Sequence, residues 1–266
     1  MAFFNFGKKD NTPQTPVQPA TPVQPMLNTE KSNGLNLNLS KEEAIVQLDL
    51  RKQEVASLCP PGTAMHGLTS RVCVALDYSG SMRNLYKSGF VQNVLERLLP
   101  IAMQFDDNGE MEVWLFENGS RRVTPISLNN FYNYIKNEDF LNKYHMGGTN
   151  YAPVMKDIYK KYIVEEPANV PTLVLFMTDG NNFDHGDTNV FIKEASKYPI
   201  FWQFVGMGDA QFEYLERLDN LKGRVVDNAN FFAVNDLNSI SDKELYSRLL
   251  GEYPQWLIDS TKANIW

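Results

Sequence analysis

The sequence predicts an α/β fold, with a doubly wound, mainly parallel central sheet and helices on both faces. Two apolar runs, 72–76 (VCVAL) and 172–177 (TLVLFM), are nearly continuous, as is typical of central parallel strands that are covered on both sides. Two further runs, 111–116 and 200–207, alternate with longer amphipathic stretches. In a sheet of this kind, ligands bind outside the carboxyl ends of the strands.

The N-terminal part of the chain has a different composition. Residues 11–25 contain the repeat TPVQP twice and too little apolar surface to offset the entropy cost of ordering. We therefore expect residues 1–34 to be a disordered N-terminal tip and Pro-rich linker. Residues 35–69 are expected to form a strand and helix extension that packs on the main domain, which spans 70–266.

A strand followed by a helix is predicted for that extension. Leucines alternate from Leu35 to Leu39, and Ser40 and Glu43 have the spacing of a capping box that starts a helix. The alternation between Val46 and Leu50 would also suit a strand, so both alternatives stay open there.

The main domain continues with regular alternation. Amphipathic patterns predict helices that separate the apolar runs, and a last strand precedes a C-terminal helix. The predicted helices cover 90–105, 151–163, 188–198 and 211–221, the last strand covers 230–234, and the final helix lies in 241–257.

Composition excludes several classes of protein. The formal net charge of −7 over 266 residues disfavours nucleic acid as a partner, because such binding depends on Lys and Arg displacing counterions. Cys59 and Cys73 are too few for a four-thiolate zinc site, and reduced thiols fit best. Neither a signal peptide nor a transmembrane segment is recognisable. We expect a cytoplasmic protein.

Three polar clusters fall where a ligand site is expected. Asp77, Ser79 and Ser81 follow the first central strand, and Asp179 follows the later strand in FMTDG. Thr149 lies in a loop, MGGTNYAP, just before a predicted helix. Hydroxyl and carboxylate oxygens without thiolate or imidazole suit a hard divalent ion, so Mg²⁺ is predicted, with Mn²⁺ or Ca²⁺ as alternatives.

The motifs DYSGSM, GGTNYAP and FMTDG together resemble a von Willebrand factor type A (vWA) domain with a complete metal-ion-dependent adhesion site (MIDAS). The longer stretch 89–120 is similar in sequence to the bacterial TerF-like branch of this family, which is associated with tellurium resistance and stress response. The resemblance covers roughly residues 40–260.

This resemblance implies a vWA/Rossmann-like fold and a role for each motif position. Ser79, Ser81 and Thr149 would bind the metal directly, while Asp77 and Asp179 would act mostly through bound waters. Because most protein ligands are then neutral, the ion keeps positive charge and an open position for an acidic side chain of a partner protein. The implied function is a metal-dependent protein-binding module and not an enzyme.

A metal-dependent hydrolase or phosphoesterase-like enzyme that uses the same site is the alternative. A haloacid-dehalogenase phosphatase would carry its acid/base carboxylate at residue 79, where this chain has Ser. The sequence also lacks a Walker A motif and a serine-hydrolase elbow.

The sequence leaves the roles of several further residues undecided. His145, Asp184, His185 and Asp187 could modulate the site or bind a second ion, but we expect solvated loop residues. Trp114, Trp202 and Phe204 are expected in strand cores, and Trp256 and Trp266 could pack on the domain or on a partner.

Overall fold

The computed structural model describes residues 39–208, 210–235 and 239–266. The chain divides into two units, Met1–Ser32 and Asn33–Trp266, and the fold below is that of the second. The predictions for residues 1–34 and for a strand beginning at Leu35 lie outside the described residues. None of the described helices combines the length and apolarity that crossing a bilayer requires.

The central sheet confirms the predicted fold class. Its six strands run in the order β3-β2-β1-β4-β5-β6, and every neighbouring pair is parallel except β2 and β3. The two nearly continuous apolar runs are the central neighbours β1 and β4. The strands are β1 (Arg71–Asp77), β2 (Met111–Phe116), β3 (Ser120–Ile126), β4 (Thr172–Thr178), β5 (Ile200–Met207) and β6 (Ala229–Val234).

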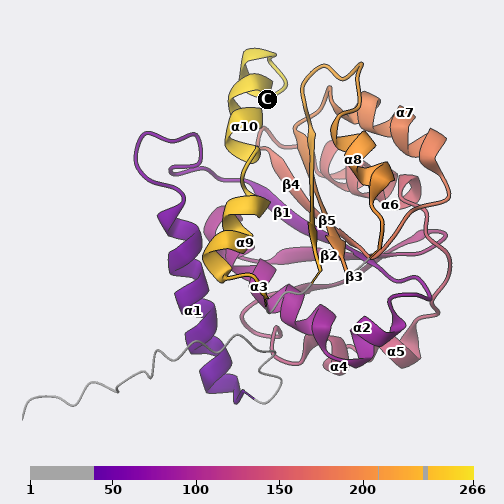
Figure 1. Cartoon of the computed structure of the whole chain (residues 1–266). Helices are drawn as coiled ribbons and strands as arrows, with labels where there is room; N and C mark the ends of the chain where they lie inside the picture. Colours follow the sequence, from indigo (N-terminus) through magenta and orange to yellow (C-terminus); the bar gives the residue numbers. More distant parts are fainter. Residues whose placement is uncertain (1–38, 209, 236–238) are drawn as a thin grey trace, which may run out of the picture. The chain divides into compact units, whose positions relative to one another are not determined.

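Helices cover both faces of the sheet (Figure 1). Alternate residues of β1 point to opposite sides, so Val72, Val74 and Leu76 join one apolar cluster and Cys73 and Ala75 join the other. The first cluster includes α1 (Lys41–Ser57), α2 (Arg83–Lys87), α3 (Phe90–Phe105), α4 (Tyr134–Asn137), α5 (Phe140–Lys143), α9 (Asp242–Leu249) and α10 (Tyr253–Lys262). The second includes α6 (Ala152–Tyr159), which continues into the π-helix η1 (Lys160–Glu165), α7 (His185–Ala195) and α8 (Glu213–Asp219).

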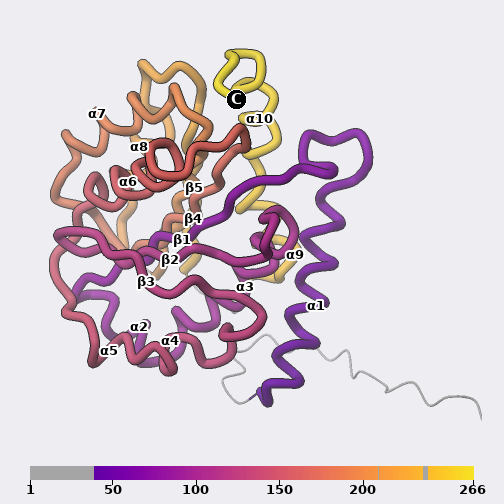
Figure 2. The backbone as a smooth tube through the Cα atoms, turned by 180° about the vertical axis from the view of Figure 1, so that it is seen from behind, coloured from indigo at the N-terminus to yellow at the C-terminus, as the bar shows by residue number. Residues whose placement is uncertain are grey.

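The predicted capping box starts α1. The Ser40 hydroxyl accepts from the backbone N–H of Glu43, and the Glu43 carboxylate accepts from the N–H of Ser40. The open alternative between Val46 and Leu50 is thereby decided in favour of helix. An ionic cluster holds α1 beside α3 and α9, because Asp242 binds Arg51 at 3.1 Å and Arg97 at 2.6 Å. The view from behind shows α1 alongside these two helices (Figure 2).

The structure adds the strand β3 and the short helices α2, α4 and α5 to the predicted elements, and it divides the predicted C-terminal helix. The strand β3 was not predicted, because it is an antiparallel edge strand with several exposed positions. The C-terminal stretch 241–257 holds parts of two helices, since Pro254 lacks an N–H group and is tolerated only in the first turn of α10.

The tryptophans lie in the domain. Trp114 and Trp202 are fully buried in the sheet, as predicted, together with Phe204. Trp256 is also buried, and the Trp266 indole N–H donates to the Ser260 hydroxyl at 2.8 Å. Both C-terminal tryptophans therefore pack on the chain's own core.

Candidate functional site

Asp77 ends β1 at the carboxyl edge of the sheet and is fully buried. Its two oxygens have separate donors: the Ser79 N–H donates to Oδ1 at 2.8 Å, and the Thr178 hydroxyl donates to Oδ2 at 2.7 Å. Burial raises the pKa of Asp77 to about 6, although these hydrogen bonds favour the ionised form. The carboxylate is therefore held rigidly in an environment that penalises its charge.

Two serine hydroxyls connect the loop after Asp77 to the other carboxylate. The Ser79 and Ser81 hydroxyl oxygens lie 3.0 Å apart, and the Ser81 hydroxyl donates to Asp179 Oδ1 at 2.9 Å. Burial also raises the pKa of Asp179. Because β1 and β4 are parallel neighbours, both acids emerge at the same edge. Ser79 is buried and Ser81 is exposed, so the cluster opens to solvent at Ser81.

Thr149 is brought to this cluster by the backbone of its loop. The Gly80 N–H donates to the Gly147 carbonyl at 3.0 Å, and Ser79 forms an isolated β-bridge with Gly147. On its other side, the Thr149 carbonyl accepts from the Phe183 N–H at 2.9 Å. The Thr149 side chain is buried, and its hydroxyl makes no hydrogen bond to any residue in the described part of the chain. The five predicted site residues thus lie at the end of β1 and on three loops that meet at one edge.

A fourth loop, after β2, was missed by the sequence analysis. The Asn118 side-chain oxygen accepts from the Gly148 N–H at 3.1 Å, and the Glu117 carbonyl accepts from the Asn150 N–H at 2.7 Å. A Cβ on Gly147 would lie 2.7 Å from Glu117 Oε2, and one on Gly148 would lie 2.5 Å from Asn118 Oδ1. A Cβ on either glycine would therefore displace one of these two side chains. A polar turn after a buried strand at this edge was the available signal.

The prediction of solvated loop residues is wrong for Asp184 and His185. The Asp184 carboxylate accepts from the backbone N–H groups of Tyr151 and Ala152, at 3.0 and 2.8 Å, and so caps α6 from a distant loop. The His185 ring stacks on Tyr214 with centroids 3.8 Å apart. His145 is an exposed loop residue, as expected, whereas Asp187 is exposed but lies in the first turn of α7.

The donor chemistry of the site fits a hard divalent ion. It offers three hydroxyls and two carboxylates, all oxygen. In residues 39–208, 210–235 and 239–266, no three His, Cys, Asp or Glu side chains are grouped as a metal site would need, so a metal here would depend on the hydroxyls. Both Asp77 oxygens already accept from protein donors. The Asp77 carboxylate is thus better suited to supply negative charge and to orient its neighbours than to bind a metal ion directly.

Comparison with known proteins relates the chain to one family. Residues 69–266 match the vWA-TerF-like family model, described as the vWA found in the TerF C terminus. The uncharacterized protein YcbR of Bacillus subtilis is 42% identical over 222 residues, which are 82% of this chain and 89% of that protein. Copine-E of Dictyostelium discoideum is 29% identical over 126 residues, 43% of this chain and 22% of that protein.

Solved structures show more distant similarity. The von Willebrand factor type A protein from Catenulispora acidiphila is 14% identical with a TM-score of 0.48, over 69% of this chain and 43% of that one. Proximal thread matrix protein 1 from the mussel byssus, in a structure with a zinc-occupied MIDAS motif, is 16% identical with a TM-score of 0.43, over 73% of this chain and 48% of that one. The chain spans less than half the length of these solved proteins.

Proposed function

Because the chain belongs to the vWA-TerF-like family, we propose that this vWA module is a metal-dependent protein-binding module with a MIDAS-type Mg²⁺ site. Ser79, Ser81 and Thr149 would hold the ion directly, and Asp77 and Asp179 would hold it mostly through water. The observation that carries the proposal is the set of contacts between the two acids. The Ser79 backbone N–H donates to Asp77, the Ser79 and Ser81 hydroxyls bond each other, and the Ser81 hydroxyl donates to Asp179.

The balance of charge supports a binding role. Three of the five proposed ligands are neutral hydroxyls, and the two acids carry the only formal charges of the set. Bound there, the ion would supply an electrophilic open position that an acidic side chain of a partner protein can fill. The exposed Ser81 lies at the solvent side of the cluster, where such a side chain would arrive.

A metal-dependent hydrolase or phosphoesterase is the second candidate. One observation favours it, since burial raises the pKa of Asp77 to about 6, close to the working range of a general base. The Asp77 side chain is fully buried, however, and both its oxygens are occupied by donors. It lacks the access to substrate that proton transfer requires.

We further propose that the module serves a bacterial tellurium-resistance or stress-response system. The support is the family match to the vWA of TerF. A deletion strain that grows normally on tellurite and under oxidative stress would contradict this assignment, without bearing on metal or partner binding.

Affinity capture from the native host tests the binding role. We expect partners that wild type retains in Mg²⁺ and releases in EDTA, and that the Ser79→Ala, Ser81→Ala double variant does not retain. An identical set of partners with and without metal would contradict the proposal. Metal-dependent hydrolysis of p-nitrophenyl phosphate that disappears in the same variant would favour the enzyme.

A further inference from the structure

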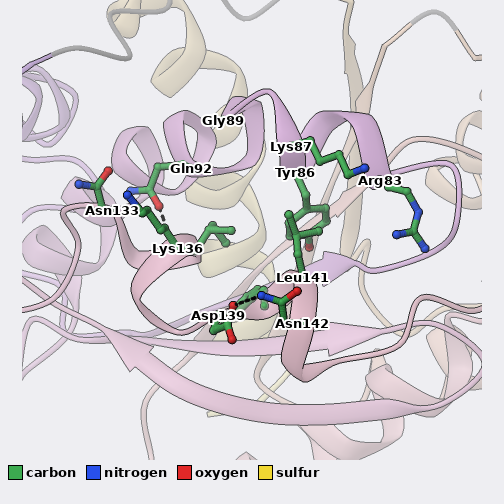
Figure 3. A pocket seen from close by; sticks show the side chains of 12 residues that line it. Arg83, Tyr86, Lys87, Gly89, Gln92, Asn133, Lys136, Asp139, Leu141 and Asn142 are labelled. Carbon is green, nitrogen blue, oxygen red and sulfur yellow. Dashed lines mark hydrogen bonds between the residues drawn. The ribbon is translucent and has the colours of Figure 1, made fainter.

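A pocket of about 630 Å³ lies among α2, the start of α3, α4 and α5, on the sheet face that carries α3. Figure 3 shows Arg83 and Lys87 toward one end of this pocket and Lys136 toward the other. Tyr86 and Leu141 lie between them. We call this feature the basic pocket. Its volume is within the range of pockets that bind small ligands.

The basic pocket has an excess of positive charge. Arg83, Lys87 and Lys136 are exposed, and in the described part of the chain none of them forms an ion pair. The one carboxylate of the lining, Asp139, accepts from the Asn142 side-chain amide at 2.7 Å. Three cations against one acid, in a chain of net charge −7, produce a local positive potential that favours an anionic ligand.

The basic pocket is joined to the candidate metal site. The Tyr86 hydroxyl donates to the backbone carbonyl of Asp77 at 3.0 Å, so a residue of the pocket also fixes the end of β1. The helix α2 begins two residues after Ser81. Lys87 is six positions after Ser81, which is about 9 Å at helical rise. An extended peptide covers that distance in about three residues.

We propose that the basic pocket receives a second acidic side chain from the same partner segment whose first acid completes the metal site. The inference rests on the proposed function. The partner would carry two acids two or four residues apart, because alternate side chains of an extended peptide point to the same face. Arg83 and Lys87 would bind the second carboxylate, while Tyr86 and Leu141 pack against its methylene groups.

Selection from a displayed library of random 12-residue peptides tests this pairing. With wild type in Mg²⁺, we expect enriched peptides to share one acid and a second acid two or four residues away. The Arg83→Glu, Lys87→Glu variant should keep the first acid and its dependence on Mg²⁺. At the second position it should select Lys or Arg, because the charge of the pocket is reversed.

A matched control reverses two exposed lysines on distant helices, Lys52→Glu with Lys243→Glu, for the same change in net charge. This control should select the same peptides as wild type. Thermal melting and Mg²⁺ calorimetry confirm that each variant folds and binds metal.

The outcomes distinguish a failure of this inference from a failure of the proposed metal-dependent binding function. Metal-dependent peptides with a single acid, or an unchanged second acid in the reversed variant, overturn the inference alone. Peptides that bind the basic pocket equally well in EDTA also overturn it, because the two acids would then not act together. If no metal-dependent peptide is selected, the proposed function fails and the inference fails with it.

Discussion

The carboxylate of Asp184 holds the start of α6 against the loop that precedes α7. It accepts from the N–H groups of Tyr151 and Ala152, and also from the Asn182 amide at 2.6 Å and the Thr188 hydroxyl at 3.3 Å. The substitution Asp184→Ala removes all four acceptor contacts. Both backbone amides belong to buried residues, so their loss of an acceptor is the main cost.

The expected destabilisation follows from these contacts. A hydrogen bond to a charged group contributes about 1.5–3 kcal/mol, and two amides are affected. Since Asp184 is half-buried, water replaces part of what is lost, and we expect a decrease of about 2–4 kcal/mol in the free energy of unfolding. For a domain of this size, the melting temperature should fall by about 5–15 °C.

Urea unfolding of wild type, Asp184→Ala and Asp184→Asn measures this effect. Asparagine keeps one carbonyl acceptor, so its variant should lie between the other two. The substitution also bears on the candidate metal site, because the Phe183 N–H in the same loop donates to the carbonyl of the proposed ligand Thr149. An alanine variant within about 0.5 kcal/mol of wild type, the range of ordinary surface substitutions, would refute the capping role.

Three other predictions concern the candidate site and residues 1–25. Burial raises the pKa of Asp77 from 3.8 to about 6, so the metal-free fold favours the protonated acid and should lose up to about 3 kcal/mol as pH rises through this window. Urea unfolding from pH 4 to 7.5 should show this contribution in wild type and not in Asp77→Asn, and equal pH profiles would contradict it. Gly148→Ala places a Cβ 2.5 Å from Asn118 Oδ1 and should cost about 0.5–1.5 kcal/mol in thermal melts, because the exposed Asn118 side chain must turn away and lose its hydrogen bond to the Gly148 N–H, whereas Gly180→Ala enters open space and should be near neutral. Deletion of residues 1–25 should leave the melting temperature nearly unchanged, because prolines and polar repeats supply no core, and a large decrease would show that this segment packs on the domain.

The sequence was informative where one residue pattern has one physical meaning. Near-continuous apolar runs identify β1 and β4 as central strands, and this places Asp77 and Asp179 at one edge before any coordinates are known. The capping box at Ser40 likewise starts α1 where predicted. The domain boundaries at residues 34 and 69 and the metal ligands stay predictions.

Long-range roles were out of reach of the sequence alone. Asp184 follows Tyr151 by 33 residues, and nothing local distinguishes a carboxylate that caps another helix from one that faces solvent. The polar turn at Glu117 and Asn118 is an ordinary hairpin turn between β2 and β3, and nothing local indicates that it contacts the Gly147–Gly148 loop. Such roles depend on tertiary packing, which local patterns do not report.

Calorimetric titration of Mg²⁺ into the metal-free protein tests the central claim most directly. Wild type should bind the ion saturably, and the Ser79→Ala, Ser81→Ala variant should give no binding heat, because two of the proposed direct ligands are absent. Ser247→Ala, which removes an exposed hydroxyl on α9, is the matched control and should bind as wild type does. Identical Mg²⁺ binding by wild type and the double serine variant would contradict the account.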